Sequence, residues 1–228
     1  MRARNLLGRT RTDLVHFVRG VAQAAGLRLS RGAVEAFAAR IAPARPEAVR
    51  AAVAPGLETL DAWNERMAAC EQYIEHMAET AFPETRWRRQ VRGVGALTAL
   101  AFVVTVDHQQ RFSSRRAVGC GLGLRPRQDQ SGERHPEWGI TKAGDGFLRR
   151  LLVQSAQRIL GPFGEDSDLR RGGLKLAARG GKKAKKRAVV AVARKLATLR
   201  HRLWVTQGDD VAWRDPAACT RPLILIRV

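Results

Sequence analysis

Apolar residues in the first part of the chain recur every three or four positions, which is the spacing of one face of an α-helix. A first helix is predicted to end at Gly26, because glycine commonly terminates helices. A second helix is predicted over Val34–Ile41, ahead of Pro43 and Pro46. The buried face of the first helix would consist of Leu14, Phe17, Val18 and Val21.

The longest helical pattern runs from about Leu57 to Glu79, where apolar residues alternate between spacings of three and four. Such alternation is typical of a seam that packs against an antiparallel helix or in a coiled coil. Two interpretations stay open, namely packing inside one chain and a dimer seam. With the preceding helices, this pattern predicts a helical connector over residues 1–86. The seam residues are Leu60, Trp63, Met67, Cys70, Ile74 and Met77.

Residues 87–208 form a second predicted region, again mostly helical. Ser113 or Ser114 is expected to cap one helix and Asp145 another, because hydroxyl and carboxylate oxygens accept from free helix N–H groups. The polar segment Arg127–Thr141 predicts a small β-hairpin with Ser131-Gly132 near its turn. Along the helix after Asp145, Arg149 and Arg150 face outward, and the inward residues are Leu148, Leu151, Leu152, Ser155 and Ile159.

The remaining residues predict a long helix between a mobile segment and a tail. Arg170–Lys186 is rich in glycine and lysine and is expected to be mobile. Asp209–Val228 fits neither region and is expected to be a tail or a late strand. The fold class is therefore mainly α, with a helical or coiled-coil connector followed by a helix-hairpin-helix-like domain that carries a small β-hairpin. The buried stripe of the long helix would be Val189, Val192, Ala193, Leu196, Leu199 and Leu203.

Composition adds a strong positive charge. The chain has 41 Lys and Arg against 21 Asp and Glu, a formal net charge of +20. A charge of this size attracts polyanions at long range, so we expect nucleic acid as a partner. The alternatives are a solubility feature and the preference of a GC-rich genome for arginine.

Two short segments are candidates for phosphate binding. Gly93 and Gly95 precede the apolar run from Ala96 and resemble the hairpin of a helix-hairpin-helix unit, whose backbone N–H groups approach a phosphate; a simple tight turn is the alternative. Cations at the start of the long helix repel the positive end of its dipole, and a bound phosphate would offset that repulsion. A solvated charge run is the alternative. These cations are Lys182, Lys183, Lys185, Lys186 and Arg187.

Other chemistry is less prominent. The cysteines Cys70, Cys120 and Cys219 are isolated and form no ligand spacing with the histidines, so we expect a reducing cytoplasm and no metal site. No apolar stretch approaches the roughly 20 residues that cross a bilayer, so no membrane partner is expected.

Seven short motifs occur in an order that resembles the C-terminal transposase domain of insertion-sequence transposases related to the Piv-type DNA invertases. Some members of that family are guided by a bridge RNA. The resemblance covers about 110 residues, and the helical stretch from Leu6 to Met77 is similar to the connector that precedes this domain. The motifs are Gly93–Ala101, Arg111–Ser114, Gly121–Pro126, Gln130–Gly132, Gly139–Gly144, Leu148–Gln154 and Ala191–Leu196.

The resemblance implies a serine nucleophile. Family members attack a DNA phosphodiester with a serine that corresponds here to Ser131, and a RuvC-like N-terminal domain holds metal ions on four acidic residues. A serine hydroxyl needs activation and nearby positive charge for such an attack. The nearby cations are Arg127, Arg134, Lys142, Arg149 and Arg150.

The sequence also departs from the family. It begins at the connector, and Asp107, Asp129 and Asp145 stand singly, so Mg²⁺ is expected only with a RuvC-like domain. We therefore expect a truncated transposase or recombinase subunit that binds DNA and carries the serine half of a composite strand-transfer site, inactive alone. The alternatives are a non-catalytic nucleic-acid-binding module and a decaying remnant. Expected partners are DNA, a second copy of the chain, a guide RNA and a separate RuvC-like chain, in the nucleoid-associated cytoplasm.

Overall fold

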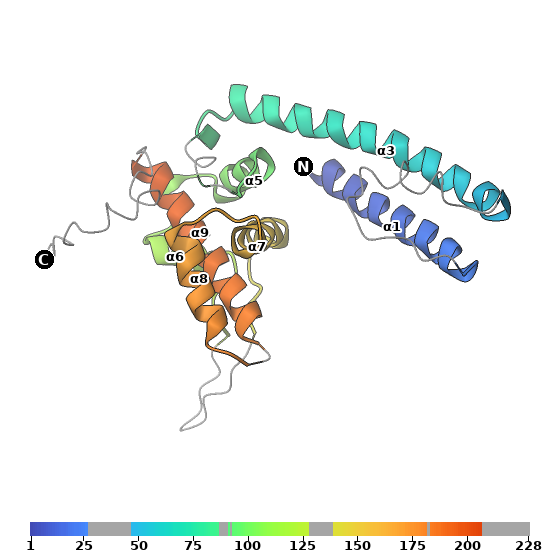
Figure 1. Cartoon of the computed structure of the whole chain (residues 1–228). Helices are drawn as coiled ribbons and strands as arrows, with labels where there is room; N and C mark the ends of the chain where they lie inside the picture. Colours follow the sequence, from blue (N-terminus) through green and yellow to red (C-terminus); the bar gives the residue numbers. More distant parts are fainter. Residues whose placement is uncertain (27–46, 87–90, 92, 128–138, 182, 207–228) are drawn as a thin grey trace, which may run out of the picture. The chain divides into compact units, whose positions relative to one another are not determined.

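Helices account for most of the chain, as the apolar pattern predicts. The computed structural model describes residues 1–26, 47–86, 91, 93–127, 139–181 and 183–206 (Figure 1). The predicted helix at Val34–Ile41, the turn at Ser131-Gly132 and the tail lie outside these residues. The chain divides into two compact units, Met1–Met77 and Ala78–Val228, which are described separately. The predicted boundary near residue 86 stays a prediction.

The first unit is an antiparallel pair of helices, α1 (Arg2–Ala24) and α3 (Glu47–Thr80), which lie side by side in Figure 1. Gly26 follows α1 with a φ of +77° and donates its N–H to the carbonyl of Gln23, as expected of a helix terminator. Helix α3 begins ten residues before the predicted Leu57 and continues through Pro55. The shared core consists of Val15, Val18, Val53, Leu57 and Leu60.

The predicted face of α1 is partly wrong. Phe17 is 54% exposed, whereas Val15 and Ala22 are buried with Val18. These three residues, spaced three and four apart, define the face that packs on α3. Phe17 lies at the edge of this face, where its ring is close to Gly56 of α3 and about half of its surface stays exposed.

Contacts inside the first unit occupy much of the predicted seam of α3. Trp63 Nε1–H donates to the carbonyl of Leu7 at 3.0 Å. Farther along α3, Arg4 donates to Glu71 through Nη2 at 2.5 Å and Nε at 3.1 Å. The seam positions Leu60, Met67 and Ile74 are buried. Over the stretch facing α1, these contacts support packing inside one chain, while self-association stays a prediction.

The second unit packs its other helices around α9. Helix α9 contacts α6, α7 and α8, and α5 contacts α7. Figure 1 shows α8 running alongside α9. No strand occurs in the part of the second unit that the structure describes. The elements are α5 (Ala96–Val106), the 3-10 helix η1 (Gln109–Arg111), α6 (Arg115–Gly121), α7 (Gly146–Leu160), α8 (Asp168–Ala178) and α9 (Ala184–Thr206).

Three side-chain caps fix where these helices begin. Ser114, and not Ser113, accepts from the N–H of Ala117 and starts α6. Asp145 accepts from the N–H of Leu148 at 2.6 Å and starts α7, as predicted. Ser167 caps α8. All five predicted inward residues of α7 are buried: Leu148, Leu151, Leu152, Ser155 and Ile159.

The prediction that Arg170–Lys186 is mobile is wrong over α8. Residues up to Ala178 are helical. Their glycines permit close packing between helices, and composition alone does not distinguish this role from flexibility. A Cβ on Gly173 would lie 2.6 Å from side-chain atoms of Leu160 and of Val192, so only glycine lets α8 approach α9 this closely. Arg171 also pairs with Asp166 and Asp168.

Helix α9 buries more than its predicted apolar stripe. Val192, Ala193, Leu196, Leu199 and Leu203 are buried as predicted, whereas Val189 is half-buried. Two polar residues of α9 are also buried: the guanidinium of Arg200 lies 5.2 Å from the centre of the Phe102 ring, and His201 Nε2 lies 2.9 Å from the carbonyl oxygen of Gln109. These contacts join α9 to α5 and η1. None of the described helices is long and apolar enough to cross a membrane.

Candidate functional site at the base of the Ser131 segment

Two backbone segments meet on either side of the segment that contains Ser131. Pro126 and Ile140 form an isolated antiparallel bridge. The N–H of Arg127 donates to the carbonyl of Gly139 at 2.8 Å, and that of Thr141 to Arg125 at 2.9 Å. We call residues 121–127 and 139–144 the loop base. Among the described residues, this bridge is the part of the predicted β-hairpin that is seen. Residues 128–138, with Ser131 and Arg134, lie outside the described residues.

Close backbone contacts hold the loop base together. Gly123 has a φ of +65°, and a Cβ there would lie 2.7 Å from the carbonyl carbon of Lys142, with the backbone of Ala143 closer still. Gly144 has a φ of +70°, and its Cβ would collide with the carbonyl oxygen of Gly121. A side chain at either glycine would therefore push the two segments apart.

Arg149 joins both halves of the loop base. Its Nη1 donates to the carbonyl of Leu122 at 3.1 Å and to that of Ala143 at 2.8 Å. The sequence predicts an outward-facing phosphate ligand at this position, and that prediction of its orientation is wrong: Arg149 is half-buried and oriented toward backbone carbonyls. Its position in the first turn of α7, which Asp145 caps, directs the side chain back over the preceding loop. Arg149 therefore positions the loop base.

Exposed cations surround this structure. Arg127 and Lys142, both candidates from the sequence, are exposed within the loop base. Arg150 is exposed on α7 with its guanidinium 5.7 Å from the centre of the Phe147 ring. Arg125, which the sequence analysis missed, is exposed beside Pro126. The carbonyl of Arg125 accepts the N–H of Thr141, which places Arg125 in the loop base. This backbone contact is visible only in the folded structure. The site is therefore rich in positive charge.

The Gly93 and Gly95 turn leads into α5. Gly93 has a φ of +88°, and a Cβ there would lie 3.1 Å from Ile159 Cγ1. Gly95 is the N-cap residue of α5 and is exposed. The positive φ and the close contact with Ile159 are a structural reason for glycine at position 93. Because residues 87–90 and 92 lie outside the described part, the helix-hairpin-helix unit stays a prediction.

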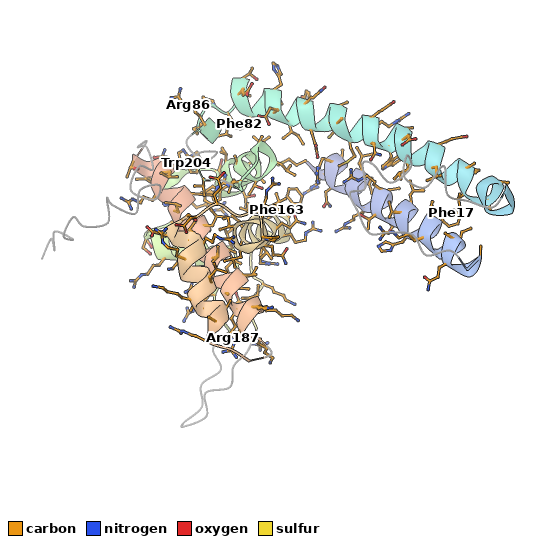
Figure 2. The ribbon with its side chains drawn as sticks, in the orientation of Figure 1. Phe17, Phe82, Arg86, Phe163, Arg187 and Trp204 are labelled. Atoms are coloured by element: carbon orange, nitrogen blue, oxygen red, sulfur yellow. The ribbon has the colours of Figure 1, made fainter. Side chains whose placement is uncertain are left out.

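The lysine cluster lies at the start of α9. Lys183 precedes the helix, and Lys185, Lys186 and Arg187 lie in its first turn, all exposed. Lys182 lies outside the described residues. Figure 2 labels Arg187 at this end of α9. The run of charges in the sequence is sufficient to predict this cluster. The sequence analysis did not include Lys175 and Arg179, which are exposed at the adjoining end of α8, because the composition of that segment predicts mobility.

Carboxylates in the described part of the second unit have structural roles or stand apart. Asp145 caps α7. The hydrogen bonds that Arg171 donates, first to Asp168 and then to Asp166, raise the pKa of its guanidinium. The carboxylate of Asp107 lies 3.4 Å from His108 Nε2. Among the described residues, no group of three or more His, Cys, Asp or Glu could hold a metal ion.

A basic helical domain with these motifs is similar to insertion-sequence transposases. Residues 89–171, which include the loop base and α5 to α7, match the family described as Transposase IS116/IS110/IS902 family. The family match therefore covers the whole segment between the two sides of the loop base, including the position of Ser131.

Individual proteins that are similar to the chain are also transposases by name. The chain is 29% identical over 204 residues to the transposase for insertion sequence element IS1111A of Coxiella burnetii, covering 87% of this chain and 56% of that protein. It is 28% identical over 175 residues to a probable family 20 transposase of Pseudomonas aeruginosa, covering 74% of this chain and 52% of that protein. Over 96 residues, it is 39% identical to the IS1328 transposase of Yersinia enterocolitica, covering 39% and 28%. The chain spans about half the length of the first two relatives.

Proposed function

We propose that this chain acts in DNA transposition, binding nucleic acid and contributing Ser131 as the nucleophile of strand transfer. The observation that carries the proposal is the transposase match over residues 89–171, which contains Ser131 and the loop base on both sides of it. The exposed cations Arg125, Arg127 and Lys142 supply a positive environment at the ends of that segment.

The proposed chemistry is a transesterification. Ser131 Oγ forms a bond to a DNA phosphorus while the bond from phosphorus to one bridging oxygen breaks, and the serine proton is lost as the released oxygen gains one. The strand is then joined to the protein as a phosphoserine diester, which a hydroxyl of the new partner strand resolves by the reverse reaction. One phosphodiester is exchanged for another, so no energy-rich cofactor is consumed.

The cations would stabilise the charge that develops on the attacked phosphate. Fixed positive groups contribute most where they need not reorganise during the reaction, and Arg149 supports this by holding Leu122 and Ala143 in place. The described carboxylates do not fit a two-metal site, so no step here is derived through Mg²⁺. The resemblance to Piv-related enzymes extends the proposal: a RuvC-like chain would supply the acidic metal ligands, and a guide RNA would be a further partner.

The test is a transposition assay in which this chain is supplied together with a RuvC-like partner. Ser131→Ala should abolish transposition, and the covalent protein–DNA adduct should disappear from denaturing gels. Ser113→Ala is the matched control, because Ser113 is exposed and does not cap α6. The chain alone should form no adduct with magnesium present; an adduct on Ser131 without any partner would contradict that part of the proposal.

A second candidate function is a non-catalytic nucleic-acid-binding module. The exposed cations at the start of α9, remote in sequence from Ser131, favour it because they could hold DNA whatever the serine does. Transposition that survives Ser131→Ala but not removal of these cations would favour the module over the nucleophile.

A further inference from the structure

Helices α8 and α9 and the turn between them carry a concentrated positive surface. All six of its residues are exposed. The sequence from Leu169 to Gly208 contains no Asp or Glu, so no acidic residue of either helix beyond Asp168 offsets them. All six residues lie beyond residues 89–171, the segment that matches the transposase family. We call it the basic ridge, and it consists of Lys175, Arg179, Lys183, Lys185, Lys186 and Arg187.

The helices under the basic ridge are tightly joined. Gly173 brings α8 against Val192 of α9, and a Cβ on Gly172 would lie 3.7 Å from Lys195 Nζ. Gly180 and Gly181, with φ values of +80° and +89°, reverse the chain between the helices. The ridge is thus presented by a fixed pair of helices, and Figure 2 shows Arg187 at its turn end. A ligand would meet cations carried on an ordered backbone, so binding need not order the chain that carries them.

The arrangement is electrostatically unfavourable without an anion. Lys183, Lys185, Lys186 and Arg187 crowd the start of α9, where the helix dipole is also positive. Among the described residues, neither Lys175, Arg179, Lys183, Lys185 nor Lys186 has an ion pair. A bound phosphate backbone would reduce the repulsion among these cations and their repulsion by the positive end of the helix dipole.

The ridge lacks the groups that hold unpaired bases. Proteins that bind single strands stack bases on exposed aromatic rings. Within the described residues 168–206 the aromatic side chain is Trp204, which is 5% exposed. Phe163, labelled in Figure 2, is 95% exposed, but it lies in the α7–α8 turn beside Glu165 and Asp166, whose charges repel phosphates. Cations without aromatic rings suit the outside of a duplex, where the bases are stacked on each other.

We infer that the basic ridge is a sequence-independent binding surface for the phosphate backbone of double-stranded DNA. The inference rests on the proposed function for the choice of DNA, and it adds a surface and a strand form that the serine chemistry does not require. The basic ridge would hold the duplex, a role different from the reaction that is proposed for Ser131.

The test measures binding of the whole chain to a 20-base-pair DNA duplex by fluorescence anisotropy at several salt concentrations. The ridge variant is Lys183→Gln/Lys185→Gln/Lys186→Gln. The control is Arg116→Gln/Arg158→Gln/Arg202→Gln, which removes equal charge from exposed positions on α6, α7 and the far end of α9. The ridge variant should bind at least tenfold more weakly, and its log–log salt slope should fall by about 3, roughly 0.9 for each phosphate that the variant no longer neutralises. The control should show a smaller decrease in both quantities.

Further arms make each failure informative. Lys183→Arg/Lys185→Arg/Lys186→Arg should retain binding, and the far-ultraviolet circular dichroism of all variants should match the parent chain. Equal decreases in affinity for the ridge and control variants would show that only net charge matters and would overturn the inference. Equal affinity for a single strand of the same length, or tighter binding of an RNA duplex, would also overturn it. If the unaltered chain binds no DNA, the proposed function itself fails.

Discussion

Arg149 Nη1 lies 2.8 Å from the carbonyl oxygen of Ala143, six residues earlier in the chain. The same nitrogen reaches Leu122, so a side chain that belongs to a family-like motif acts on the protein's own backbone. Hydrogen bonds to two carbonyls give this arginine a role in holding the loop base, and its role as a nucleic-acid ligand stays a prediction.

Arg149→Met should destabilise the second unit. The substitution keeps the aliphatic stem but removes both hydrogen bonds, which should lower the free energy of unfolding by about 1–2 kcal/mol. Arg150→Met is the control, because Arg150 is exposed and its guanidinium lies over the Phe147 ring. Urea unfolding followed by circular dichroism compares them. Equal stabilities for the two variants would argue against the positioning role.

Gly144→Ala should be much more disruptive than Gly139→Ala. A Cβ on Gly144 meets the carbonyl oxygen of Gly121 at a φ of +70°, whereas a Cβ on Gly139 meets nothing within 4 Å. We expect Gly144→Ala to cost more than about 2 kcal/mol from backbone strain and collision, and Gly139→Ala less than about 0.5 kcal/mol. Thermal unfolding of both variants measures the difference, and a Gly144→Ala protein as stable as its control would contradict the close approach.

Ser114 and Ser113 can be separated by single substitutions. Ser114→Ala removes the N-cap of α6 and should lower the free energy of unfolding by about 1 kcal/mol, because the N–H of Ala117 loses its acceptor. Ser113→Ala should have almost no effect. Chemical denaturation is sufficient to measure this, and a larger effect at Ser113 would reverse the assignment of the cap.

In the first unit, Leu60→Ala should destabilise the α1–α3 pair. Leu60 is fully buried in the shared core, so the cavity and the reduced burial should cost about 2–5 kcal/mol. Leu6→Ala is a matched control, since Leu6 is 64% exposed on α1. The free energies of unfolding of the two variants give the comparison. If Leu60→Ala is as mild as Leu6→Ala, the seam of α3 finds its main partner elsewhere.

The sequence is sufficient for features that depend on local chemistry. The caps at Ser114 and Asp145 and the inward face of α7 follow from side-chain type and helical spacing, and all three are confirmed. Features that depend on the partner element are harder to predict. Phe17 and Val15 both lie within an apolar arc of α1, and only α3 decides which is covered.

Glycine is the other source of error. In Gly172-Gly173 it permits two helices to touch, whereas in Gly180-Gly181 it supplies the positive φ of a turn, and composition does not separate these roles. The predicted orientation of Arg149 is wrong for a related reason. The carbonyls of Leu122 and Ala143 are far apart in sequence and come together only in the folded domain.

The bridge between Pro126 and Ile140 fastens both ends of the intervening stretch independently of what that stretch contains. Because the entropy of closing a loop rises only slowly with its length, residues 128–138 could be lengthened, shortened or exchanged for those of a relative while the surrounding helices keep their packing. The second unit thus offers a graft site: chimaeras between this chain and its relatives could transfer the peptide that contains Ser131 alone and test which properties are transferred with it.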